Sequence, residues 1–161
     1  MQTPKLKAAL VTFALASLAG SALAAPPAGQ FQCSLTSPST ATGATIKITG
    51  SSKLIVKVST GNVNFQLKVK GVTNAMDNPV TDMTPNTNTF QIDVIRPGGM
   101  LATQMFPFTI SSGKVSQKFP VANGSFAGGA LTTGDTIDIR AVRLVQGGTG
   151  DTFAVCGLTI K

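Results

Sequence analysis

The chain has 161 residues, of which 13 are Lys or Arg and six are acidic, giving a formal net charge of +7. It contains no His, Tyr or Trp and only two Cys. Ser-His-Asp and Cys-His nucleophile sites are therefore excluded, as are His-ligated zinc or copper sites. Two cysteines are also too few for a thiolate zinc site.

The N-terminus predicts an exported protein. Two lysines and no acid precede an alanine-rich apolar run, and residues 22–24, Ala-Leu-Ala, fit a small-x-small cleavage site. This pattern is typical of a secretory signal peptide, residues 1–24, followed by a single domain, residues 25–161. An uncleaved N-terminal anchor is the alternative, and no later segment is apolar enough to span a bilayer. We expect a periplasmic or extracellular location.

The two cysteines, Cys33 and Cys156, lie near opposite ends of the chain that remains after cleavage. Export implies an oxidising compartment, so we predict a disulfide bond between them. A disulfide needs Cα atoms within about 7 Å, and the first and last strands should therefore be neighbours. Two free thiols or an intermolecular bridge are the alternatives.

The first predicted strand is residues 31–35, and a meander with a readable register follows it. Apolar residues recur with period two, the strand pattern, in three segments. These segments are residues 46–48, 54–58 and 63–69. A two-residue turn at residues 60–61 sets Val56 opposite Phe65, and a three-residue turn at residues 50–52 pairs the first two segments, apolar against apolar throughout. A slip of one residue would reverse a whole strand, which favours these registers.

Residues 71–89 have no clear periodicity and are rich in Asn, Asp, Thr and Pro. Unstructured connections of this length are uncommon in compact domains and are often binding loops or mobile segments. A short strand could lie within this one. Residues 90–95 form the next predicted strand, which residues 96–99, Arg-Pro-Gly-Gly, bring to an end.

A second hairpin is predicted between residues 100 and 121, with its turn at residues 112–113. This register pairs Phe106 with Phe119. Pro107 and Pro120 cannot donate to a strand ladder, so they suit an edge strand or strand ends.

The C-terminal part holds a glycine-rich loop, residues 122–134, and two more strands. In the first, residues 136–145, the apolar parity changes, which indicates either a bulge near residues 140–141 or burial on both faces. The last strand, residues 152–160, follows a turn and carries Cys156. About nine short strands with frequent turns predict an all-β fold, an antiparallel β-sandwich of immunoglobulin-like or jelly-roll-like topology.

Carboxylate chemistry has weak support in the sequence. The six acids are all Asp, no spacing marks a catalytic pair, and solvated turn residues account for them. We therefore predict no enzymatic activity and no cofactor. Calcium needs only oxygen ligands, and Asp77, Asn78 and Asp82 are weak candidates, although no calcium-loop spacing is met.

Five lysines fall on the polar side of the predicted strands, and no acid occurs in residues 25–76. These lysines are Lys47, Lys53, Lys57, Lys68 and Lys70. They predict a basic sheet face that attracts an anionic polymer, such as an acidic polysaccharide or another surface polymer. Specific nucleic-acid binding is disfavoured, because the face lacks Arg and interleaved aromatic residues. The plainer interpretation is that the lysines keep the face soluble and discourage edge-to-edge association.

Two functions of different classes remain. The first is a non-catalytic binding or adhesion-type module at the cell surface, which uses the basic face or the loop of residues 71–89. The second is a structural subunit of an extracellular assembly, in which copies associate through strand edges. An aspartate- or calcium-dependent enzyme is a distant third. A monomer that binds anionic polymer favours the first function, and concentration-dependent filaments favour the second.

Overall fold

The structure is a computed structural model that describes residues 27–38, 46–84, 87–143 and 151–161. The described part contains ten strands, one short 3-10 turn and no α-helix. The strands are β1 (Gly29–Ser34), β2 (Ile46–Ile48), β3 (Lys53–Val58), β4 (Asn62–Lys70), β5 (Val72–Asn74), β6 (Asn88–Ile95), β7 (Leu101–Phe108), β8 (Lys114–Ala122), β9 (Thr136–Arg143) and β10 (Asp151–Thr159). The 3-10 turn, η1 (Asn123–Ser125), follows β8.

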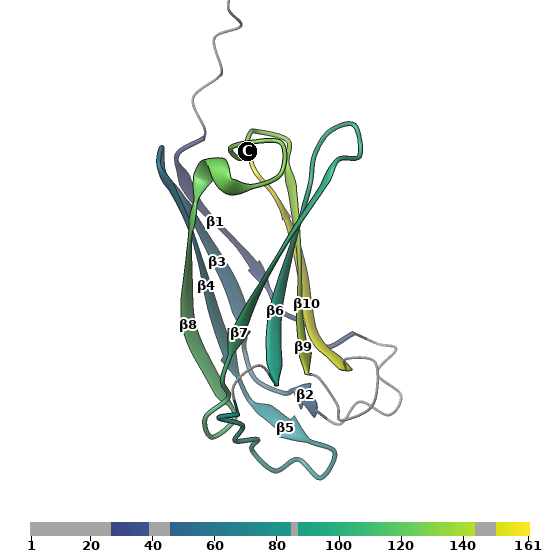
Figure 1. The fold of residues 1–161 in the computed structure, drawn as a ribbon. Coiled ribbons are helices and arrows are strands. Elements are labelled where there is room, and N and C mark those ends of the chain that lie inside the picture. The colour runs from purple at the N-terminus through teal and green to yellow at the C-terminus, as the bar shows by residue number, and fades with distance from the viewer. Residues whose placement is uncertain (1–26, 39–45, 85–86, 144–150) are drawn as a thin grey trace, which may run out of the picture.

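Eight of these strands form two four-stranded antiparallel sheets that pack face to face (Figure 1). One sheet has the order β1-β3-β4-β8 and the other β10-β9-β6-β7, while β2 and β5 form a separate pair at one end. The predicted all-β sandwich is confirmed, and its finer topology, immunoglobulin-like or jelly-roll-like, stays a prediction. The predicted signal peptide lies outside the described residues. No helix in the described ranges has the length and apolarity needed to cross a membrane.

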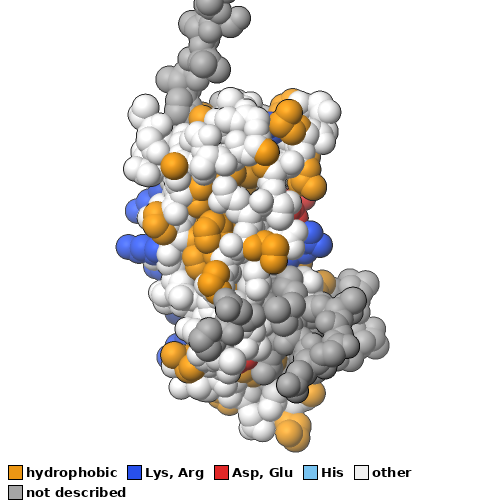
Figure 2. All heavy atoms as spheres, in the orientation of Figure 1, with side chains coloured by type: hydrophobic (Ala, Val, Ile, Leu, Met, Phe, Trp, Pro, Cys, Tyr) orange, Lys and Arg blue, Asp and Glu red, His pale blue; other side chains and the backbone are white. Residues whose placement is uncertain are grey.

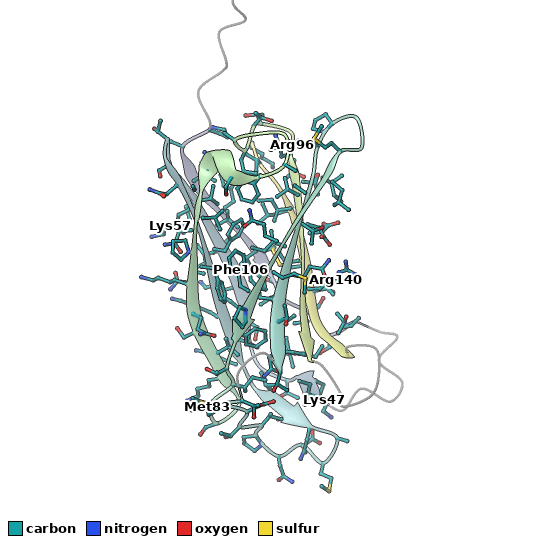
Figure 3. The ribbon with its side chains drawn as sticks, in the orientation of Figure 1. Lys47, Lys57, Met83, Arg96, Phe106 and Arg140 are labelled. Carbon is teal, nitrogen blue, oxygen red and sulfur yellow. A yellow bond between two sulfur atoms is a disulfide. The ribbon has the colours of Figure 1, made fainter. Side chains whose placement is uncertain are left out.

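The space between the two sheets is filled by apolar side chains from both. Leu54 and Leu67 of the first sheet and Ile92 of the second are fully buried. An aromatic cluster joins the layers, because the Phe119 ring stacks on Phe90 with centroids 5.2 Å apart. Phe106, which lies between β7 and β8 in Figure 3, approaches the same Phe119 ring to 5.1 Å. Burial of this inner layer is the main favourable term that holds the sheets together.

A disulfide bond and a backbone bridge close one side of the sandwich. Cys33 of β1 and Cys156 of β10 are bonded, with their Cα atoms 6.0 Å apart, as the sequence predicts. Next to the disulfide, Thr36 and Val155 exchange two backbone hydrogen bonds of 3.0 and 2.9 Å. The first and last strands are therefore neighbours in space, although they belong to different sheets.

The register predicted for β3 and β4 is confirmed, because Val56 lies opposite Phe65 across the turn at residues 60–61. The pairing predicted for residues 46–48 with β3 is wrong, since β2 pairs with β5 instead. Between the pair Lys53↔Lys68 and the pair Ile48↔Val72, the strand side of β2 and β3 advances five residues, while the side of β4 and β5 advances only four. Residues 50–52 are thus a bulge that bends the hairpin, and not a turn.

The turn predicted at residues 112–113 is confirmed, but the hairpin predicted beyond it is wrong. Ser112 and Gly113 have φ of 46° and 69°, and Ser111 bridges to Lys114 across them. Beyond that bridge the two strands separate: β7 pairs with β6 in one sheet, and β8 pairs with β4 in the other. Both strands are sheet edges, which suits the prolines that each contains.

The strand after residue 135 keeps one parity where its side chains are described, since Ile137, Ile139 and Ala141 are all buried. Strand β9 pairs with β6 without interruption, so the bulge predicted near residues 140–141 is not in β9. The irregularity lies in β10, between Thr152 and Ala154. Phe153 is the extra residue there, and its side chain is fully buried.

The disulfide bond is expected to contribute strongly to stability. Replacing Cys33 and Cys156 together by Ala should lower the free energy of unfolding by about 4 kcal/mol, since the oxidised bond closes a very long loop in the unfolded chain. Urea denaturation, followed by circular dichroism, measures this difference. As a control, a reductant should bring the wild type to the stability of the double variant and leave the variant unchanged. Coinciding unfolding curves of the oxidised wild type and the variant would contradict the expectation.

Candidate functional site

The outward-facing side of the sheet β1-β3-β4-β8 carries six of the eight lysines that follow residue 24. We call this surface the basic face. Its lysines are Lys53 and Lys57 on β3, Lys68 and Lys70 on β4, and Lys114 and Lys118 on β8. All six alternate in sequence with inward-facing residues, so they point to the same side of the sheet. In Figure 2 the Lys and Arg side chains gather along the flank of the molecule where this sheet lies, and Figure 3 labels Lys57 there.

The register places like charges directly next to one another on the basic face. Lys53 lies opposite Lys68, and Lys70 lies opposite Lys114. None of the four strands contains an acid, and among the described residues no ion pair involves a lysine of this face. The positive charge is therefore not neutralised within the part of the protein that the structure describes.

Amide side chains occupy positions between the lysines. Gln32 of β1 and Gln66 of β4 flank Ile55, the apolar residue that faces outward from the centre of β3. Ile55 is only 7% exposed although it lies on the outer side of the sheet. The long polar side chains around Ile55 must therefore cover it. The face presents amide and ammonium groups to the solvent, with the apolar Ile55 side chain beneath them. Asn64 is the other central amide, and its Oδ1 is buried without a hydrogen-bond partner.

The structure changes the predicted membership of this face at three positions. Lys47 lies on β2, outside the four-stranded sheet, and its Nζ is 2.7 Å from the Asp77 carboxylate. Lys114 and Lys118 belong to the face, although the sequence pattern did not place them there. That pattern predicted a local hairpin of β8 with β7, whereas β8 pairs with β4.

The outer side of the other sheet carries an aspartate held by three side chains. The Asp93 carboxylate accepts hydrogen bonds from Thr103 Oγ1 at 2.6 Å, from Gln91 at 3.0 Å and from Arg140 at 2.9 Å. Burial alone raises the pKa of Asp93, but these hydrogen bonds and the Arg140 charge outweigh it, and the net pKa lies below the ordinary value of an aspartate. A carboxyl group that stays ionised cannot serve as a general acid near neutral pH.

Two further aspartates, Asp135 and Asp138, lie just before and within β9. Asp135 is fully buried, and its carboxylate lies 3.3 Å from Arg96, which also donates to the Gly129 and Ala130 carbonyl groups. This pair fixes the glycine-rich loop before β9. Asp138 is exposed and lies opposite Asp93 in the register.

The weak calcium candidates do not form a ligand cluster in the described structure. Asp77 is exposed, has φ of 60° and pairs with Lys47, while Asn78 belongs to the same turn. Asp82 is buried and accepts a hydrogen bond from the Thr84 backbone. Among the described residues, no group of three acidic, His or Cys side chains is placed to hold a metal ion. Within residues 71–89, β5 is the short strand that the sequence analysis left open, and Asp82 forms a backbone bridge to Ile110.

Relief of the lysine repulsion should stabilise the protein. Replacing Lys53 and Lys68 by Gln should raise the free energy of unfolding by about 0.5 kcal/mol at low salt, since directly opposed like charges destabilise a sheet by amounts of this order. Denaturation at low and high ionic strength measures the change. The gain should shrink in high salt, which screens the repulsion. A loss of stability in the variant at low salt would show that the two lysines do not repel one another in the folded state.

The Asp93 cluster should make stability fall in acid. Because the pKa of Asp93 is lower in the folded than in the unfolded chain, its stabilisation is complete above the unfolded pKa and disappears as the pH drops through the folded one, that is, below about pH 4. Asp93→Asn should therefore lower the free energy of unfolding by about 2 kcal/mol at pH 7. This deficit should narrow at pH 2–3. The exposed Asp77→Asn serves as the control and should change stability little, since Asn tolerates positive φ. An equal deficit for Asp93→Asn at both pH values would contradict this account.

Comparisons with known proteins give this site no family context. A scan against models of protein families found no match, and searches of curated proteins and of solved structures found none either.

Proposed function

We propose that this is an exported, non-catalytic binding module that holds an anionic surface polymer on its basic face. The observation that carries the proposal is the position of the lysines within the sheet. Four of the six lie on β3 and β4, the two central strands of β1-β3-β4-β8. A surface with several uncompensated positive charges attracts polyanions and concentrates them nearby.

The plainer interpretation accounts for only part of this arrangement. Lysines that prevent edge-to-edge association belong on edge strands, and only Lys114 and Lys118 lie on one. Lysines that serve solubility are ordinarily mixed with acids, and these four strands contain no acid. Lys53 and Lys68 are also paired at a cost to stability. Lysines that oppose one another and lie away from a sheet edge, as on β3 and β4, are better explained by a ligand than by protection against association.

The chemistry of the face favours an acidic polysaccharide. Lysine ammonium groups supply point charges for carboxylate or sulfate groups, and the neighbouring amides of Gln32 and Gln66 can exchange hydrogen bonds with sugar hydroxyl groups. Nucleic acid is the weaker candidate, since the outward positions hold no Arg and no aromatic ring for base stacking. The disulfide bond supports a location outside the cytoplasm, where such polymers occur.

Retention on immobilised polyuronate and on dextran sulfate tests this function. The variant Lys53→Gln with Lys68→Gln removes two directly opposed charges from the two central strands of the basic face. We expect binding to weaken about tenfold or more, since a lysine beside an anionic surface contributes about 1 kcal/mol. Lys47→Gln with Lys161→Gln is the matched control. It removes the same two charges outside the face, and its retention should stay close to that of the wild type.

Two results would overturn the proposal. Equal losses in the two variants would show that retention follows net charge and not the basic face. Wild-type protein that elutes without retention at physiological ionic strength would remove the polymer as a ligand, because the attraction would then be only a low-salt effect.

A further inference from the structure

The four sheet edges of the sandwich differ in what they expose. On β8, two exposed lysines, Lys114 and Lys118, stand on the edge strand and oppose the approach of another basic chain. On β1 and β10, the disulfide and the Thr36–Val155 bridge occupy one end of each edge. The edge of β7 has neither protection. No charged residue occurs between Arg96 and Lys114, the segment that contains the whole of β7.

The backbone groups that β7 offers at its open edge follow from the ladder with β6. Arg96 donates its backbone N–H to the Met100 carbonyl at 2.9 Å, so alternate residues from Met100 onward bond to β6. The residues between them turn their N–H and C=O groups to the open edge. These residues are Leu101, Thr103, Met105 and Pro107. Pro107 has no N–H to offer, and it falls on the outward side, where its missing donor costs the β6 ladder nothing.

The outward positions of β7 also expose apolar side chains. Leu101 is 57% exposed and Met105 is 62% exposed, and both lie on the outer side of the sheet, with the partly exposed Ile95 beside Leu101. Figure 2 shows further hydrophobic side chains in the middle of the view, between the two flanks that carry Lys and Arg, on the margin of the sandwich where the ribbons of β7 and β8 face the viewer in Figure 1. In the described structure no strand pairs with this edge.

We propose that the β7 edge pairs with the β7 edge of a second copy of this chain. An antiparallel pair with its twofold axis at Thr103 places Leu101 opposite Met105 of the second copy and Met105 opposite its Leu101. All three outward residues with an N–H then form hydrogen-bonded pairs, and Pro107 falls opposite Gly99, beyond the partner strand. A shift of one pair in either direction places Leu101 and Met105 opposite polar residues, proline or the adjoining turn. The register, the absence of charge and the position of the proline therefore all point to the same isologous contact.

Charge favours this contact over the other edges. The six lysines of the basic face lie on the other sheet of each copy, so two basic proteins can meet at β7 without bringing those lysines together. The twofold axis of an antiparallel strand pair runs perpendicular to the joint sheet. The two basic faces therefore point in the same direction and form one wider surface. One polymer chain could then contact both copies, which would increase the avidity of binding. This gain in avidity rests on the proposed function, whereas the dimer itself does not.

The oligomeric state of the protein without any polymer tests the dimer. Sedimentation of the wild type should show a mass that rises with concentration from monomer to dimer and then stops. Thr103→Pro removes the central outward N–H and should abolish the rise. Thr103→Val is the matched control: like the proline variant it loses the hydrogen bond to Asp93, but it keeps the backbone N–H and should still dimerise.

A crosslinking measurement keeps the test decisive if the proline variant does not fold. Thr103→Cys should be joined to a second copy by a short bis-maleimide, and Ser116→Cys, an exposed position on the β8 edge, should not. Met105→Lys should reduce the dimer fraction by adding charge to the contact.

A wild type that stays monomeric up to about 1 mM, or equal crosslinking at the two cysteines, would overturn the proposal. Growth beyond a dimer would overturn it in favour of open-ended assembly. Polymer retention by the monomeric variant separates the failure of the dimer from that of the proposed function.

Discussion

The fold depends on one closed side. The Cys33–Cys156 bond and the adjoining Thr36–Val155 bridge join β1 of one sheet to β10 of the other, and the two cysteines are 123 residues apart in the sequence. On the opposite side, the tight turn at residues 112–113 lies between β7, which belongs to one sheet, and β8, which belongs to the other. The two sheets are therefore joined by a disulfide bond along the margin formed by β1 and β10, and not along the margin formed by β7 and β8. At this second margin, β7 and β8 are edge strands with backbone groups that no strand of the described structure pairs with.

Because the inner side chains and the disulfide hold the sheets together, the outer side of β3 and β4 is free to carry charge. The residues that alternate with its lysines, such as Leu54, Val56 and Leu67, are fully buried. They secure the strands whatever stands on the other side. Directly opposed like charges, as at Lys53 and Lys68, are expected to oppose this stability. The outer sides of the two sheets differ, since Asp93 on the other sheet pairs with Arg140, whereas no lysine of the basic face forms an ion pair among the described residues.

The sequence predicted local pairings well and distant ones poorly. The β3–β4 register follows from a short turn and from period-two apolar residues, so it needs no information from elsewhere in the chain. The same reasoning failed for β2. A bulge and a turn both appear in a sequence as a few small residues between two strands, and only the pairing of β2 with β5 shows that residues 50–52 are a bulge. It failed again for β8, whose partner β4 lies far back in the sequence. Lys114 and Lys118 were missed for that reason alone, since their alternation with Val115 and Phe119 already marked them as outward-facing.

The unequal protection of the two open edges is the feature that a solubility role for the lysines leaves unexplained. Both β7 and β8 carry a proline in the outward register, so both tolerate lost donors, but only β8 carries charge. If selection had acted only against association, β7 would need charge more than β8, since Leu101 and Met105 expose its apolar surface. The charge instead lies on the strand that continues the basic face. The lysines therefore follow the basic face and not the exposed edge, which agrees with the proposed contact at β7.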